Sequence, residues 1–155
     1  MYDNMKNLNK LIKSNDGAAL IVVIVAFLVI IILSASILFL MNTNLRQARH
    51  QEHMIEAYYL AYSGIEMGYA ALIANGDELL NDFIDEYNNN SSYIKEENSI
   101  IFGEGKINIL ISGYEEKDNL WISIKSTGIL NQSGISTSMS MSFLADNKSI
   151  RKWEK

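Results

Sequence analysis

The 155-residue chain contains no cysteine, no proline and only two histidines, His50 and His53. The absence of cysteine excludes disulfide scaffolds, thiolate metal sites and cysteine nucleophiles. Without proline, no helix is interrupted by a pyrrolidine ring. Two histidines leave little for an imidazole-rich metal site or a His-based catalytic triad. We therefore expect neither an enzyme nor a protein with a cofactor or a small-molecule substrate.

Charge is also limited, with 13 basic against 18 acidic residues and a net charge of −5. A nucleic-acid-binding domain is usually basic on one face, so the balance argues against such a partner. The carboxylates of Glu115, Glu116 and Asp118 lack the spacing of a calcium loop, and we interpret them as a solvated turn. The basic tail, residues 148–155, could dock on an acidic neighbour or, through Trp153, bind DNA. We prefer to interpret it as a frayed terminus.

Hydrophobic residues are concentrated in one run, residues 18–41, where only Ser34 and Ser36 are polar. As a helix this run would be about 36 Å long, enough to cross a hydrocarbon core of about 30 Å. Its Leu, Ile, Val and Phe side chains favour insertion by about 5–10 kcal/mol. A cleaved secretory signal has a shorter apolar region, and a buried core helix would need a larger enclosing domain. We predict a membrane-spanning helix in contact with lipid.

Basic residues on the two sides of this run indicate its orientation. Lys6, Lys10 and Lys13 precede it, whereas Arg46 and Arg49 follow it. Because cytoplasmic flanks are richer in Lys and Arg, the amino terminus is expected in the cytoplasm. The remaining polar part would then lie outside the membrane.

A short basic leader, one glycine and the apolar run follow one another near the start of the chain. The segment Lys13-Ser14-Asn15-Asp16-Gly17 leads directly into Ala18-Ala19-Leu20. This arrangement resembles the processing region of type IV pilins and type II secretion pseudopilins. The resemblance implies that a prepilin peptidase cuts between Gly17 and Ala18 and that Ala18 is then N-methylated. The alternative is that Gly17 is only a flexible junction before a helix.

Val22 occupies the fifth position after Gly17, where major pilins carry a glutamate. A buried carboxylate in an apolar helix is costly unless it is paired, and in that family the partner is the amino terminus of a neighbouring subunit. Val22 cannot neutralise that amine. Its presence resembles the PilX-type minor pilins and the K-type pseudopilins, which are placed at filament tips. The resemblance therefore implies a tip-type subunit.

Helical periodicity continues beyond the apolar run to about residue 74. Five small residues recur every three or four positions and would line one groove of the helix: Ala57, Ala61, Gly64, Gly68 and Ala71. Glycine inside a helix costs about 1 kcal/mol relative to alanine, so close packing must offset it. The partner could be the chain's own sheet or the helix of a neighbouring pilin. The segment 57–66, with its aromatic pair and Ser-Gly-x-Glu, also resembles the PilX-type amino-terminal module.

Four polar side chains near the end of the apolar run would lie at the level of the lipid headgroups: Arg46, Arg49, His50 and His53. Arginine can contact lipid phosphate there, for about 1 kcal/mol per charge near an anionic surface. The two histidines, three positions apart and next to Glu52, could also be interpreted as a metal pair. Since no third ligand is evident, a solvated polar collar is the preferred interpretation.

The remaining residues predict a small domain. Asn75-Gly76 is a helix stop, and residues 77–87 read as a short acidic helix. Apolar residues then alternate with polar ones at 107–111, 121–125 and 135–143, and the last segment carries Ser136, Ser138, Ser140 and Ser142 facing water. Residues 113–119 and 128–134 are expected to be turns. An antiparallel meander of three or four strands would pack on the long helix.

Four parts are therefore expected: a cytoplasmic leader (1–17), a transmembrane half-helix (18–41), an amphipathic extracytoplasmic half-helix (42–74) and an α+β head (75–155). The expected fold is pilin-like. The function implied by the resemblance is a minor type IV pilin on the cell surface, packed against other pilins, that primes or caps a filament. The alternatives are a K-type pseudopilin of a secretion or DNA-uptake machine and an uncleaved single-pass protein with an external binding or sensing domain.

Overall fold

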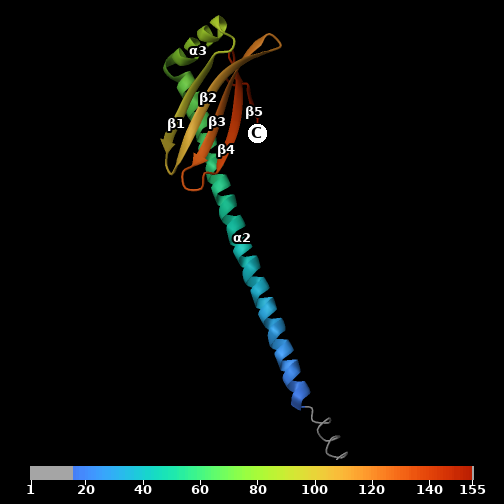
Figure 1. The fold of residues 1–155 in the computed structure, drawn as a ribbon. Coiled ribbons are helices and arrows are strands. Elements are labelled where there is room, and N and C mark those ends of the chain that lie inside the picture. Colours follow the sequence, from blue (N-terminus) through green and yellow to red (C-terminus); the bar gives the residue numbers. More distant parts are fainter. Residues whose placement is uncertain (1–15, 155) are drawn as a thin grey trace, which may run out of the picture. The chain divides into compact units, whose positions relative to one another are not determined.

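The structure is a computed structural model that describes residues 16–154. It begins with helix α2, Asp16–Ile73, whose 58 residues cover the apolar run and the amphipathic stretch after it. The chain divides into two units, residues 1–48 and residues 49–155. In the first unit, α2 exposes every described side chain up to Ala48. The second unit contains the rest of α2 and all the other elements (Figure 1).

Two short elements connect α2 to the sheet. A 3-10 turn, Ala74–Gly76, ends the long helix, and Asn75 and Gly76 both have positive φ there. Helix α3, Glu78–Asn89, follows and buries Leu80, Phe83 and Tyr87. The predicted helix stop at Asn75-Gly76 and the short acidic helix are therefore both present. Tyr87 is a core residue that the sequence pattern did not reveal.

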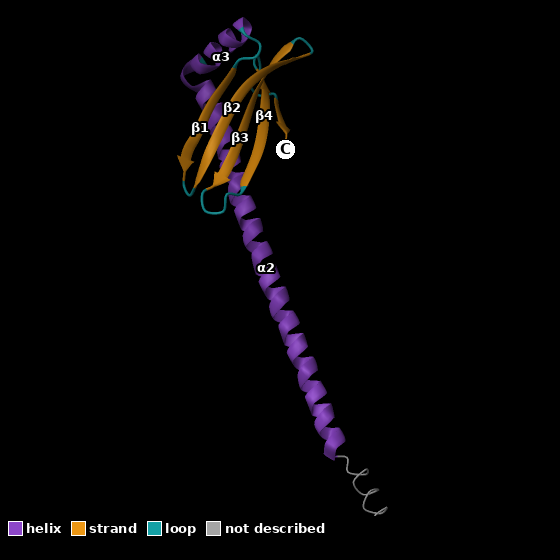
Figure 2. Cartoon of the chain, in the orientation of Figure 1, coloured by secondary structure: helices purple, strands orange, loops and turns teal. Residues whose placement is uncertain are grey.

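Five antiparallel strands form one sheet in the order of the sequence (Figure 2). Their bounds are β1, Ile94–Phe102; β2, Gly105–Glu116; β3, Asn119–Leu130; β4, Ser136–Leu144; and β5, Arg151–Glu154. Two-residue connections join β1 to β2 and β2 to β3, since Phe102 pairs with Gly105 and Glu116 with Asn119. Residues Lys117 and Asp118 both have positive φ, as the tight turns of hairpins require.

The core lies between one face of the sheet and residues 57–72 of α2. Alternate strand residues enter it, among them Ile107, Ile122, Ile124 and Phe143, none of which is more than 1% exposed. The helix contributes a second set of buried residues to the same core: Ala57, Leu60, Ala61, Ile65, Tyr69 and Leu72. The pilin-like α+β architecture expected from the sequence is thus present.

The structure corrects three details of the sequence-based prediction. The sheet has five strands instead of three or four, because β1 and the tail strand β5 join its two edges. Gly113 and Gly128, expected in turns, lie inside β2 and β3 and pair with Ile122 and Ile107. Of the four serines of β4 expected to face water, Ser142 is buried and pairs with Lys152 of β5.

Candidate functional site

The predicted processing site lies at the start of the described chain. Residues 1–15, most of the predicted leader, lie outside the described residues, whereas Gly17 and Ala18 belong to α2. Val22 is 67% exposed in the isolated chain. Large apolar side chains from Leu20 to Met41 share this exposure. A surface of this kind in water would be strongly unfavourable, so lipid or other helices must cover it.

The same helix is long and apolar enough to cross a membrane, as judged by length and composition, and it lies near the amino terminus. All the residues of the apolar window are exposed, unlike those of a helix buried in the core of a soluble protein. This agrees with the predicted membrane span. Ser36 donates its hydroxyl to the Ile32 carbonyl at 2.8 Å, so this polar group is satisfied within the helix.

The predicted polar collar is solvated in the isolated chain. Arg46, Arg49 and His50 are exposed, while His53 is half-buried and its Nδ1 lies 3.2 Å from Glu56 Oε2. Among the described residues no cluster of three potential metal ligands exists. His53 is thus paired with a carboxylate of its own helix.

The five small residues of α2 do not all lie in one environment. Ala57, Ala61, Gly64 and Gly68 are buried against the chain's own sheet, whereas Ala71 is exposed beside it. A Cβ on Gly64 would lie 2.5 Å from Ile107 Cγ2 and 3.1 Å from Ser126 Cβ. On Gly68 it would lie 3.1 Å from Ile124 Cγ2. Two packing partners were expected for these small residues: the chain's own sheet or the helix of a neighbouring subunit. In the structure the chain's own sheet packs against four of the five.

Gly128 of β3 lies directly against these small residues of the helix. A Cβ on Gly128 of β3 would lie 2.6 Å from the Ala61 backbone nitrogen and 2.6 Å from Leu60 Cβ. Helix and strand backbones therefore approach each other more closely than side chains would permit. Ser126, two residues earlier, is fully buried against Gly64, and its hydroxyl has no hydrogen-bond partner among residues 16–154. The close approach thus leaves one desolvated polar group.

The carboxy-terminal strand, which sequence reasoning treated as frayed, is held by several contacts. The Lys152 ammonium lies 2.5 Å from Glu116 Oε2 and 3.8 Å from the centre of the Trp121 ring. The Trp153 ring stacks on Tyr62 of α2 with centroids 5.6 Å apart. Lys148, just before the strand, pairs with Asp77. In the sequence, the signal of this docking is weak: one aromatic residue, Trp153, stands among charged residues.

The pKa values of three titrating groups at these contacts are shifted by their neighbours. The hydrogen bond that the Lys152 ammonium donates to Glu116 lowers the pKa of that carboxyl and raises the pKa of Lys152. On α2, the negative charge of Glu66 raises the pKa of Tyr62. The Glu116–Lys152 pair therefore stays ionised over a wide range of pH.

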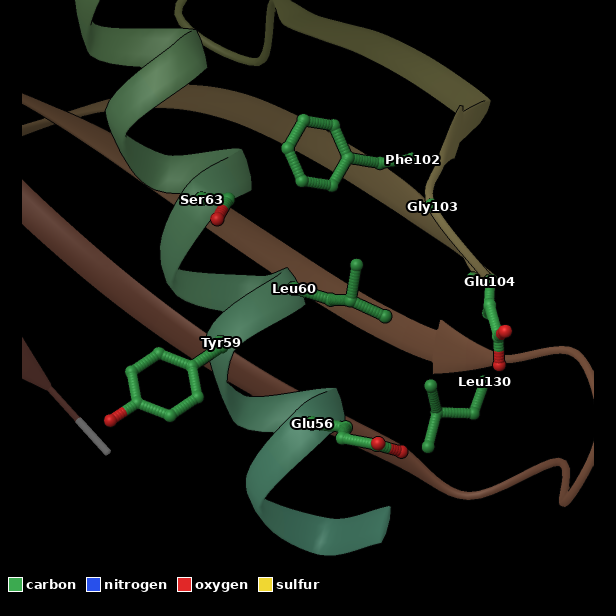
Figure 3. Close-up of a pocket in the computed structure, with 9 residues that line it drawn as sticks. Glu56, Tyr59, Leu60, Ser63, Phe102, Gly103, Glu104 and Leu130 are labelled. Carbon is green, nitrogen blue, oxygen red and sulfur yellow. The ribbon is translucent and has the colours of Figure 1, made fainter.

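One cavity of about 350 Å³ lies between α2 and the β1–β2 hairpin (Figure 3). Leu60 and Leu130 supply apolar surface, Phe102 stands at one side, and the carboxylates of Glu56 and Glu104 lie near Leu130. A smaller cavity of about 180 Å³ adjoins it, sharing Glu56, Glu104 and Leu130.

In comparisons with known proteins, no family model, no curated protein and no solved structure matches the chain.

Proposed function

We propose that this chain is a minor subunit of a type IV filament, similar to PilX-type minor pilins, that helps to prime or cap assembly and has no enzymatic activity. The main support is the combination found in helix α2. Its first stretch exposes a membrane-length apolar surface, and its second stretch packs on a small antiparallel sheet through buried alanines and glycines. The leader-like segment before Ala18 adds the sequence support.

In this proposal the uncut precursor stays in the bilayer with its amino terminus in the cytoplasm, and the peptidase then cuts after Gly17. The freed helix leaves the lipid and packs among the helices of other pilins. Only another apolar environment can receive it, since burying apolar area gains about 25 cal/mol per Å² relative to water. The mature subunit would end up in a pilus on the cell surface.

The packing of the sheet on α2 does not need to change when the helix moves from lipid to the filament. The small-residue face of α2 is already occupied by the chain's own sheet, so assembly does not need to rearrange the core. What remains available to sister subunits is the exposed part of α2. Val22 supports a tip position, because a subunit that carries no carboxylate there cannot pair with the amino terminus of a neighbour.

Mass spectrometry of the mature amino terminus tests the proposal directly. We expect a peptide that begins at Ala18 and carries one N-methyl group. Gly17→Leu should leave the precursor uncut, whereas Asp16→Asn, one residue away, should be processed normally. An intact start at Met1 or Tyr2 in native membranes would overturn the proposal and favour an uncleaved single-pass protein with an external binding domain.

A further inference from the structure

Strand β1 forms one edge of the sheet, and its outer side has no neighbouring strand in the described part of the chain (Figure 2). An edge strand of this kind presents a row of unpaired N–H and C=O groups. Its pairing with β2 is regular from Ile94 to Glu97, and the register shifts between Glu97 and Ile100. The outer side of β1 can therefore bond the backbone of one more strand.

A cavity of about 330 Å³ lies beside the inner face of β1, and we call it the β1 cavity. Its apolar lining includes Met67 of α2, Leu79 of α3 and Ile100 of β1, together with Ile109 and Ile111 of β2. A strand added to β1 would direct every second side chain to this face of the sheet. The β1 cavity can therefore receive an apolar side chain from such a strand.

Two opposite charges of β1 lie at the same cavity. Lys95 pairs with Ile111 and Glu97 with Ile109, so both charged side chains are on the face of the sheet that carries the core. Lys95 is half-buried and Glu97 is exposed. Within residues 16–154, no ion pair joins either of them to another group. An added strand can supply a carboxylate opposite Lys95 and a cation opposite Glu97.

Inward-pointing charges on an edge strand normally prevent its pairing with other chains. They exclude apolar strands, because an unpaired charge would be buried. A strand with opposite charges at the matching positions escapes this exclusion, so the same two residues select their partner.

A second copy of the chain is a poor partner for this edge. Parallel pairing in register places Lys95 beside Lys95 of the copy. Antiparallel pairing that joins Lys95 to Glu97 of the copy places Glu96 opposite Glu96. Like charges directly opposite each other destabilise a strand pair, so a strand of different sequence fits better.

We propose that β1 receives an extended segment of a different protein as a sixth strand, antiparallel like all the other pairs of the sheet. From its amino terminus, this segment carries an apolar, a basic and an acidic residue at alternate positions, opposite Ile100, Glu97 and Lys95. The apolar residue enters the β1 cavity, and backbone hydrogen bonds to β1 contribute affinity. The two charge pairs decide which segments bind.

Two synthetic peptides of identical composition test the inference. Thr-Ile-Thr-Arg-Thr-Glu-Thr matches β1, whereas Thr-Ile-Thr-Glu-Thr-Arg-Thr has the two charges exchanged. Fluorescence anisotropy of the labelled peptides, titrated with the full chain in detergent, measures their affinities. We expect the matched peptide to bind roughly fivefold more tightly, because it forms two favourable cross-strand pairs. The double variant Lys95→Glu with Glu97→Lys should reverse this preference.

Hydrogen exchange followed by mass spectrometry locates the bound peptide. The matched peptide should slow exchange in residues 94–102 and leave it unchanged at β5, the other edge of the sheet. Ala71→Leu, which fills part of the β1 cavity, should weaken binding several-fold. Ala70→Leu is the matched control, since Ala70 is exposed on the same helix and does not line the cavity.

The inference is overturned if the two peptides bind equally. It is also overturned if neither binds at millimolar concentration, since Lys95 and Glu97 would then act only as edge protection. A dimer that forms without peptide and protects β1 from exchange would overturn it as well, because a second copy would then cover the edge. These measurements involve neither processing at Gly17 nor filament assembly, so their outcome is independent of the proposed function.

Discussion

Helix α2 has two stretches that differ in the size of the side chains at their surfaces: residues 20–41 and residues 57–68. From residue 20 to residue 41 nearly every position carries a large aliphatic or aromatic group, and all of them are exposed. From Ala57 to Gly68 two alanines and two glycines are buried against strands, where they alternate with the buried side chains of Leu60 and Ile65. Large apolar groups suit a fluid environment such as lipid, whereas small ones suit a rigid backbone at close range. One helix can therefore serve a membrane and a sheet.

The largest expected effect comes from making the first stretch polar. Val25→Arg combined with Ile32→Arg should cost about 5–7 kcal/mol of insertion free energy, on a scale where the whole run gains about 5–10. Most of the protein should then leave the membrane fraction after a carbonate wash. The matched pair Val25→Leu and Ile32→Leu should remain in the membrane. If the arginine variant also remains, lipid does not cover this stretch.

Enlarging the second stretch should break the packing of the head. Gly64→Val would place methyl groups where Ile107 and Ser126 already lie. Overpacking typically costs 1–3 kcal/mol, and we expect about 3 kcal/mol here because helix and sheet would have to separate. Thermal unfolding followed by circular dichroism in detergent measures the loss.

Ala70→Val is the control for this change, since Ala70 is an exposed residue of the same helix. It should lower the unfolding midpoint only slightly, through the weaker helix propensity of valine. If Gly64→Val and Ala70→Val lower the unfolding midpoint equally, helix propensity would explain the loss, and contact between Gly64 and the sheet would not.

A smaller, opposite effect is expected where the close approach leaves a polar group unpaired. Ser126→Ala removes a fully buried hydroxyl that has no hydrogen-bond partner in the described part of the chain. Leaving such a group desolvated costs about 1–3 kcal/mol, so the substitution should raise the free energy of unfolding by about 1 kcal/mol. Ser136→Ala, on an exposed serine, should change it little. Destabilisation by Ser126→Ala would indicate that the hydroxyl is satisfied.

The smallest effect concerns the docking of β5 and depends on pH. Glu116 has a pKa below its ordinary 4.5, so its pairing stabilises the fold above that pH and is lost as pH falls through the lowered value. Lys152 has a pKa above 10.5, so its contribution is present below that pH and is lost as pH rises through the raised value. Glu116→Gln should therefore lower the unfolding midpoint near neutrality and converge with the wild type in acid. A difference unchanged at acidic pH would contradict the pairing.

Sequence patterns predicted the regular elements well and the irregular ones poorly. The long helix, the short helix and β2 to β4 follow from clear periods of 3.6 and 2. Strand β1 was missed because Lys95, Glu96 and Glu97 hide its alternation, and because its register with β2 shifts between Glu97 and Ile100. At this shift Ser99 adopts a positive φ, and its amide donates to Asn108 Oδ1 at 2.8 Å.

Strand β5 and the two strand glycines were misjudged for a related reason. Arg151–Glu154 has no apolar alternation, and its place depends on Glu116, Trp121 and Tyr62, which are remote in the sequence. Glycine is typical of turns, which is why Gly113 and Gly128 were assigned to them. In the structure each lies inside a strand, where a helix packs closely on the sheet: α3 at Gly113 and α2 at Gly128. A Cβ on Gly113 would meet the Tyr87 ring at 2.8 Å.

The sequence by itself determined what depends on local order along the chain: the membrane-length apolar run, the helix that continues from it, and the alternating strands. The hydrophobic period depends on residues that are neighbours in the chain, so it can be recognised without knowledge of the packing partner. Only the tertiary structure decided which surface the small residues of α2 face, how the tail docks and where the cavity between α2 and the β1–β2 hairpin forms. Each of these depends on side chains that are far apart in the chain and become neighbours only when the sheet closes on the helix.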